Sequence, residues 1–181
     1  RQQTAKASVV YGALQKALRE EDAQRIKAAA GELVEKYGGT AYAPLAALAT
    51  AKALFDAGDT KTAKLQLQWV AENGKDELQD LARLRLAALL LDEKVYDEAH
   101  RQLDAASGAG FAVRVLDMRS DVFAAQSKPA EARAALQAAL AKLEQLDGAG
   151  NERNSLQDKR ANAAYRELLQ LKIDALPESA S

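Results

Sequence analysis

Apolar residues recur every three or four positions along most of the chain, which is the spacing of one buried face on an α-helix. The residue types also favour helix throughout, because only three prolines and ten glycines occur. Polar turns interrupt the apolar stripes at regular intervals. The pattern predicts helices over residues 4–19, 23–37, 41–55, 60–72, 77–91, 96–106, 111–125, 129–146 and 153–176.

Three alanines, Ala63, Ala99 and Ala132, mark the same point in successive helix pairs, 36 and 33 residues apart. Four sets of residues keep fixed offsets from them: Leu67, Leu103 and Leu136 (four later), Val70, Ala106 and Ala139 (seven later), Leu54, Leu90 and Phe123 (nine earlier), and Ala51, Ala87 and Ser120 (twelve earlier). Small residues suit close helix crossings and large ones fill the gaps between helices. This order, at a spacing near the ~34 residues of a tetratricopeptide unit, predicts an all-α, tetratricopeptide-like helical-repeat solenoid. Solenoids of this kind usually bind other proteins.

The same register predicts one domain over residues 1–176. A degenerate first repeat occupies residues 4–39, because Ile26 stands where the alanine is expected. Three full repeats follow at about 41–74, 76–108 and 110–146, then a C-terminal capping helix at about 152–176. Residues 177–181 are expected to form a disordered tail.

Helix ends carry recognisable signals. We expect Asp22, Thr40 and Asp59 to cap the helices that follow them. Gly38 and Gly39 are expected to end the second helix in a left-handed conformation. Residues 147–151 are predicted to be the longest flexible stretch. The last helix offers these candidate packing residues: Leu156, Ala163, Ala164, Leu168, Leu171 and Ile173.

Composition narrows the function. Charged residues make up 28% of the chain but nearly cancel, giving a net charge of −1, which argues against nucleic acid or an anionic membrane surface as the partner. No cysteine is present and no run of about 18 apolar residues occurs. Because the chain begins with Arg1 rather than methionine, we interpret it as a fragment or processed chain whose preceding segment held any targeting or membrane anchor.

Candidate chemistry is sparse. The single histidine, His100, has no histidine or cysteine partner, and Asp104 alone does not complete a metal site, so a surface or packing role is favoured. The glycines around Ala109 lack the lysine and spacing of a phosphate loop. Trp69 is interpreted as packing between repeats, with a binding anchor as the alternative. We therefore predict no catalytic residues, no metal site and no cofactor.

The expected binding surface lies on the first helix of each repeat, which lines the concave face of tetratricopeptide arrays. The repeat register selects these candidate groove residues: Leu45, Leu48, Lys52, Phe55, Leu81, Leu84, Asp92, Arg114, Asp117 and Asp121. The predicted groove is apolar towards its N-terminal end and charged towards its C-terminal end. An alternative is that the leucines and Phe55 only fill the superhelix, or that the last helix lies in the groove.

Several segments resemble one family. The run 42–48 with Ala51 and Lys52 is similar to its first full repeat, and Arg83–Ala87 followed by Tyr96–Ala99 is similar to its middle repeat. Residues 110–112, 117–121 and 130–139 resemble its third repeat, and 171–176 its C-terminus. On these residues the chain resembles the YfgM-like proteins, ancillary subunits of the bacterial SecYEG translocon, from about residue 2 to 176.

The resemblance implies a bacterial inner-membrane protein with one N-terminal transmembrane anchor, absent here, and a periplasmic repeat domain. It implies the SecYEG translocon and the periplasmic chaperone PpiD as partners, and a role in passing secreted proteins to periplasmic folding factors. Two departures stand out: Ser120 replaces a usual glycine, which should fit, and Gln126-Ser127-Lys128 replaces a glycine–acidic turn, so we expect that loop to differ in shape.

Two other functions remain open from the residues alone. A cell-envelope assembly scaffold would use the same repeat. An enzyme or ligand-binding protein would need a pocket with converging ionisable groups in the concave face.

Overall fold

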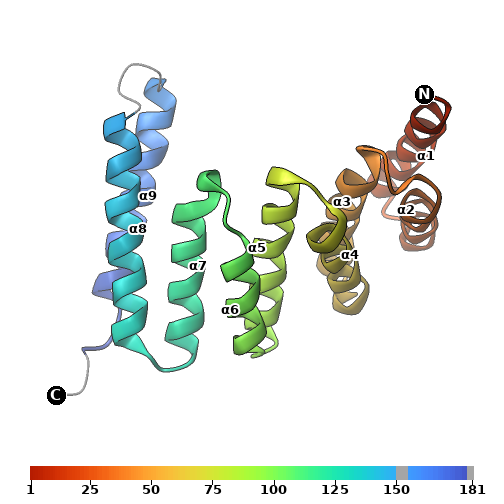
Figure 1. Cartoon of the computed structure of the whole chain (residues 1–181). Coiled ribbons are helices and arrows are strands. Elements are labelled where there is room, and N and C mark those ends of the chain that lie inside the picture. The colour runs from red at the N-terminus through yellow and green to blue at the C-terminus, as the bar shows by residue number, and fades with distance from the viewer. Residues whose placement is uncertain (150–154, 179–181) are drawn as a thin grey trace. The chain divides into compact units, whose positions relative to one another are not determined.

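The computed structural model describes residues 1–149 and 155–178, and every regular element in those ranges is helical. The predicted all-α fold class is confirmed. The helices, drawn in Figure 1, are α1 (Gln2–Arg19), α2 (Ala23–Tyr37), α3 (Tyr42–Asp56), α4 (Thr60–Asn73), α5 (Asp76–Asp92), α6 (Tyr96–Ala105), a short 3₁₀ turn η1 (Ala109–Phe111), α7 (Ala112–Ala125), α8 (Pro129–Ala149) and α9 (Leu156–Asp174).

The chain divides into two compact units, Arg1–Leu86 and Ala87–Ser181, and α5 contains the boundary. In the first unit α1 packs on α2, both contact α3, and α3 packs on α4. In the second unit α6 packs on α7, α7 on α8, and α8 on α9. The single-domain organisation over 1–176 and its repeat boundaries stay predictions.

The repeat positions form the core. Ala63, Ala99 and Ala132 are fully buried. The residues at the four fixed offsets are buried as well, apart from the half-buried Phe123. Ser120 fits its small-residue position as expected, since it is buried and its hydroxyl donates a hydrogen bond to the Asp117 carbonyl at 2.6 Å.

The same turn joins the two helices of four successive pairs. Each turn has one residue in the left-handed region: Glu21 (φ 53°), Gly58 (φ 90°), Lys94 (φ 62°) and Ser127 (φ 59°). The next backbone N–H then donates to a carbonyl five residues earlier: Asp22 to Ala17 (3.1 Å), Asp59 to Leu54 (2.8 Å), Val95 to Leu90 (2.9 Å) and Lys128 to Phe123 (2.9 Å). The first pair thus shares the turn of the later three. At Gln126-Ser127-Lys128, Ser127 adopts the same left-handed conformation as the corresponding residues of the earlier turns. The expected difference from the turn of the resembled family stays a prediction.

Several predicted helix ends need correction. Asp22 and Asp59 cap α2 and α4 as predicted, by accepting the backbone N–H of the third residue after each. Thr40 does not cap α3, because its hydroxyl donates to the Tyr37 carbonyl at 2.7 Å and satisfies the end of α2 instead. Gly38 ends α2 with φ −57°, so the expected left-handed conformation is absent there.

The predicted flexible stretch at 147–151 is also partly wrong, because 147–149 continue α8. Asp147 is held by α9: it accepts a hydrogen bond from Asn162 at 2.6 Å and pairs with Arg166. Gly150 and Asn151, and residues 179–181 of the expected tail, lie outside the described residues.

Candidate protein-binding surface

The outward face of α3 carries apolar side chains around one lysine. Leu45 and Phe55 are 41% and 44% exposed, and Lys52 is exposed between them. The opposite face of α3 is buried and consists mostly of small residues, together with Leu48 and Leu54. Leu48, also predicted for the groove, is buried and stabilises the core of the unit. Leu45 and Phe55 are thus two exposed apolar groups on one face of α3, separated by Lys52.

The predicted groove residues of α5 are less accessible. Leu84 is buried and Leu81 is half-buried, so both contribute to packing. Asp92 is exposed at the end of α5 and belongs to the second unit.

The outward face of α7 is engaged by α9. Asp117 accepts a hydrogen bond from the Tyr165 hydroxyl at 2.7 Å and pairs through its other oxygen with the Lys172 ammonium. Lys172 also pairs with Asp121 at 2.7 Å, while Arg114 is exposed. Two of the three predicted groove residues on α7 are therefore bonded to the chain's own last helix. We call Asp117, Asp121, Tyr165 and Lys172 the α7–α9 network.

Burial and hydrogen bonding shift two pKa values in the α7–α9 network. Burial of the Tyr165 hydroxyl raises its pKa well above the ordinary 10.0, and the hydrogen bond to Asp117 adds to the rise. Burial of Lys172 lowers its pKa, but hydrogen bonds to Asp117 and Asp121 outweigh burial, and the net pKa is raised above 10.5. At neutral pH Lys172 is therefore an ammonium and Tyr165 a neutral phenol.

Apolar packing holds α9 in this position. Leu169 is fully buried in a cluster with Leu136, Ala139 and Leu143 of α8, and α9 runs alongside α8 in Figure 1. The partly buried side chains packed against this cluster are Tyr165, Ile173 and Leu176 from the C-terminal segment, and Val113, Leu116 and Leu140 from α7 and α8.

The packing face predicted for α9 is largely wrong. Of the six residues expected to pack, only Ile173 contacts the cluster, and Leu156, Leu168 and Leu171 are exposed. Leu169, Tyr165 and Lys172 were not identified from the sequence. Tyr165, Leu169, Ile173 and Leu176 are spaced by four, four and three residues, so they form one apolar stripe of a helix, and this spacing could have identified the packing face. A second apolar stripe on the same helix gives an equally good pattern.

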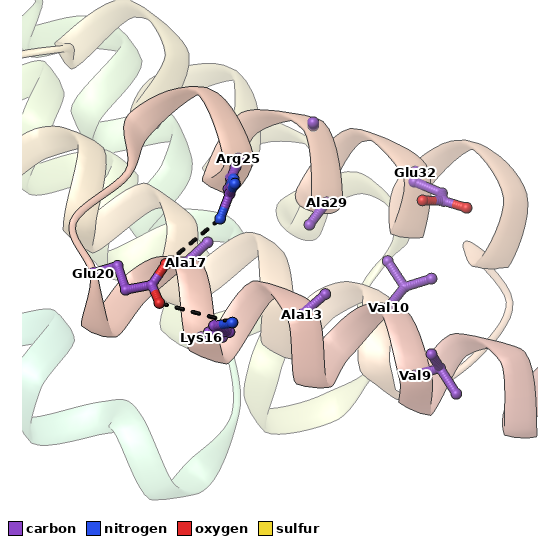
Figure 2. Close-up of a pocket in the computed structure, with 10 residues that line it drawn as sticks. Val9, Val10, Ala13, Lys16, Ala17, Glu20, Arg25, Ala29 and Glu32 are labelled. Carbon is purple, nitrogen blue, oxygen red and sulfur yellow. Dashed lines mark ion pairs between the residues drawn. The ribbon is translucent and has the colours of Figure 1, made fainter.

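A hollow of about 380 Å³ lies between α1 and α2 (Figure 2). Valine and alanine side chains form most of its wall: Val9, Val10, Ala13, Ala17, Ala28 and Ala29. Glu20 closes one end, where it pairs with Lys16 at 3.9 Å and Arg25 at 3.7 Å (Figure 2). These charged groups at the rim of the hollow are paired with one another. The hollow therefore suits an apolar side chain better than acid–base chemistry.

The single histidine and the single tryptophan of the chain contribute to packing. His100 lies against the Phe123 ring, with 4.6 Å between centroids, and its Nε2 is 2.9 Å from the Gln126 side-chain oxygen. A Cβ atom at Gly38 would stand 3.5 Å from the Trp69 ring, which places Trp69 of α4 against the end of α2. Within residues 1–149 and 155–178, no group of three or more histidine and carboxylate side chains is placed to hold a metal.

None of the helices in the described part of the chain is long and apolar enough to cross a membrane. A family model described as a tetratricopeptide repeat-like domain matches residues 1–178. A Neisseria gonorrhoeae protein named ancillary SecYEG translocon subunit is 36% identical over 171 residues, covering 94% of this chain and 74% of that protein.

Two solved structures share the fold. A MamA fragment from Desulfovibrio magneticus RS-1 has a TM-score of 0.58 at 18% identity, over 96% of this chain and 98% of that one. A double mutant of MamA RS-1 has a TM-score of 0.55 at 19% identity, over 94% of this chain and 97% of that one. At these identities the likeness supports the helical-repeat fold alone.

Proposed function

This chain belongs to the tetratricopeptide repeat-like family that includes ancillary SecYEG translocon subunits, and we propose that it is a non-catalytic protein-interaction domain acting beside the secretion channel. The family membership supports the interaction role. The α3 surface formed by Leu45, Lys52 and Phe55 is the part of the predicted groove that best fits a partner, because its apolar groups are exposed.

The chemistry of the α3 surface defines the segment that it would bind. Leu45 and Phe55 offer apolar area on either side of the Lys52 ammonium, which suits a helix or extended segment with apolar anchors and one acidic group. A nascent secreted protein exposes apolar anchors of this kind before it folds.

The location and partners are part of the same proposal. The name of the Neisseria relative associates that protein with the SecYEG translocon. We infer a bacterial inner-membrane protein whose repeat domain faces the periplasm, with the translocon and PpiD as partners. In this role the domain helps secreted proteins pass to periplasmic chaperones. Membrane attachment would confine the partners to one surface, so that a modest affinity suffices.

Recovery of detergent-solubilised SecYEG translocon and PpiD on the full-length protein tests the proposal. The double variant Leu45→Ser with Phe55→Ser should reduce recovery about tenfold or more, because two apolar anchors are lost from one surface. Leu65→Ser is the matched control, since Leu65 is an exposed leucine on α4, outside the proposed surface.

Charge variants separate the two ends of the predicted groove. Lys52→Glu should weaken recovery, whereas Arg114→Glu should leave it within about twofold. Recovery that is unchanged by the α3 variants and lost with Arg114→Glu would place the binding surface on α7 and contradict the proposal.

A further inference from the structure

Helix α9 has two apolar faces, and its own unit covers only one. The covered face contains Leu169 and Ile173. The other carries five exposed residues separated by three, four, three and four positions: Ala161, Ala164, Leu168, Leu171 and Ala175. Leu168 and Leu171 are 51% and 59% exposed. This spacing is that of the seam between two helices in a coiled coil.

We propose that this seam packs against the same seam of a second copy of the chain, with the two α9 helices antiparallel. In the best register Leu168 lies opposite Ala164 of the second copy, and Leu171 lies opposite Ala161. Each of the two leucines then faces an alanine, so the helices can approach closely at these four positions. The two-fold symmetry repeats every contact, as an isologous interface requires.

The charges at the edge of the seam favour the same register. Arg160 and Asp174 flank the seam on one side, two helical heptads apart. In the antiparallel pair Arg160 therefore lies beside Asp174 of the second copy, and symmetry provides two such ion pairs. A shift by one heptad in one direction would place Glu167 beside Asp174 and Leu168 opposite Leu171, which is worse in both charge and size. A shift in the other direction would place Leu168 opposite Gln157, which is worse in size.

A parallel pair fits poorly. It would bring Arg160 and Glu167 towards the positions of Tyr165 and Lys172 in the second copy. Both of those side chains are already bonded to α7, Tyr165 to Asp117 and Lys172 to two carboxylates. A parallel in-register pair would also place Leu168 opposite Leu168, whereas the antiparallel pair places each of the two seam leucines opposite an alanine.

The self-complementary pattern identifies the partner as a second copy. Read from one end, the first four seam residues are small, small, large and large, and the antiparallel copy presents them in reverse. A contact of about two heptads is small, so we expect a weak dimer that forms as concentration rises. This inference does not depend on the proposed translocon role, because it uses only residues of α9.

Sedimentation velocity of the 181-residue chain over a wide concentration range tests the dimer. The wild type should pass from monomer to dimer as concentration rises. Leu168→Glu should raise the midpoint concentration by about tenfold or more, because it places two carboxylates in the seam. Since Leu168 is exposed in the monomer, circular dichroism should show an unchanged helix content. Leu65→Glu, an exposed leucine on α4, is the matched control and should leave the midpoint unchanged.

Charge exchange tests the register. Arg160→Glu should weaken the dimer, and adding Asp174→Arg should restore it, because the pair is re-formed with opposite signs. Glu167→Gln should strengthen the dimer, because Glu167 of each copy lies near the two-fold axis. A wild-type chain that stays monomeric throughout, or a dimer that tolerates Leu168→Glu, would overturn the proposal. A dimer that the double exchange fails to restore would overturn the antiparallel register.

Discussion

Helices α3 and α7 hold the same place in their repeats, yet they meet their surroundings differently. Leu45 and Arg114 both lie 18 residues before the repeat alanine, and Lys52 and Asp121 both lie 11 before it. On α3 both Leu45 and Lys52 are exposed. On α7 Asp121 is bonded to Lys172 of α9.

The difference shows that repeat register alone does not define a binding surface. At the position 15 residues before the alanine, Leu48 is buried in α3, whereas Asp117 of α7 pairs with Lys172 and Tyr165. On α7 this face is covered, because Lys172 of the last helix, α9, pairs with Asp117 and Asp121. The apolar copy on α3 is the one that we propose binds other proteins.

The largest expected effect comes from the packing that holds α9 against α8. Leu169→Ala should lower the free energy of unfolding by about 3 kcal/mol, because it leaves a cavity in a fully buried cluster. The neighbouring Leu168→Ala should cost less than about 0.5 kcal/mol, because Leu168 is exposed in the monomer. Urea denaturation at low protein concentration measures both. Equal costs would mean that α9 does not pack through Leu169.

Removing the central charge of the α7–α9 network should have the next largest effect. Lys172→Ala leaves Asp117 and Asp121 without their shared partner, and should cost about 2 kcal/mol. It should also make α9 more susceptible to limited proteolysis. Lys159→Ala, an exposed lysine on the same helix, should change neither property. If the two variants behave alike, the network does not hold α9 in place.

Substitutions at two equivalent turn positions, Gly58 and Ser127, should change the free energy of unfolding by smaller amounts and in opposite directions. Gly58→Ala should destabilise by about 1 kcal/mol, because φ at Gly58 is 90° and a side chain is strained there. Ser127 is the equivalent residue of its turn and has φ 59°, a left-handed conformation that is strained for serine but not for glycine. Ser127→Gly should therefore stabilise by up to about 1 kcal/mol. Thermal denaturation of the two variants compares them directly. A stabilising Gly58→Ala would show that the turns are not equivalent.

The two units should also respond to opposite extremes of pH. The folded-state pKa values of Tyr165 and Lys172 are raised, so the stabilisation from these two titrations is fully present just below pH 10.0 and is lost as pH rises through the folded-state pKa values. Spectrophotometric titration should show one tyrosine ionising after the others, and Tyr165→Phe should remove it. Simultaneous ionisation of all tyrosines would contradict the buried hydrogen bond.

In the first unit, hydrogen bonds from Lys27 and Thr62 lower the pKa of Asp59 from 3.8 to about 2. The stabilisation from this cap is present above pH 3.8 and is lost as pH falls through about 2. Asp59→Asn should retain the cap and reduce the acid sensitivity of unfolding. An unchanged acid midpoint in that variant would show that the Lys27–Asp59 pair is not responsible.

The features that can be predicted from the sequence are those with local or repeated determinants. The burial of Ala63, Ala99 and Ala132 and the caps at Asp22 and Asp59 depend on offsets within one helix pair. These offsets are visible in the sequence because each repeat presents the same packing requirement.

The sequence does not predict which face of α9 packs against α8, or that α9 covers the outward face of α7. Helix α9 has two apolar stripes, and only its contact with α8 selects the one that contains Leu169. Asp117 and Lys172 are 55 residues apart, so no spacing rule connects them. For the candidate surface, the repeat register identified Leu45 and Phe55 as outward positions, but it did not distinguish them from the buried Leu48.

Site-specific photocrosslinking in membranes tests the central claim most directly, with a photoreactive amino acid at position 45 or position 114 of the full-length protein. Both positions are exposed and hold the same place in their repeats. We expect crosslinks to the SecYEG translocon, PpiD or a secreted chain from position 45, and few from position 114. Crosslinks to these proteins that are equal or stronger from position 114 would contradict it.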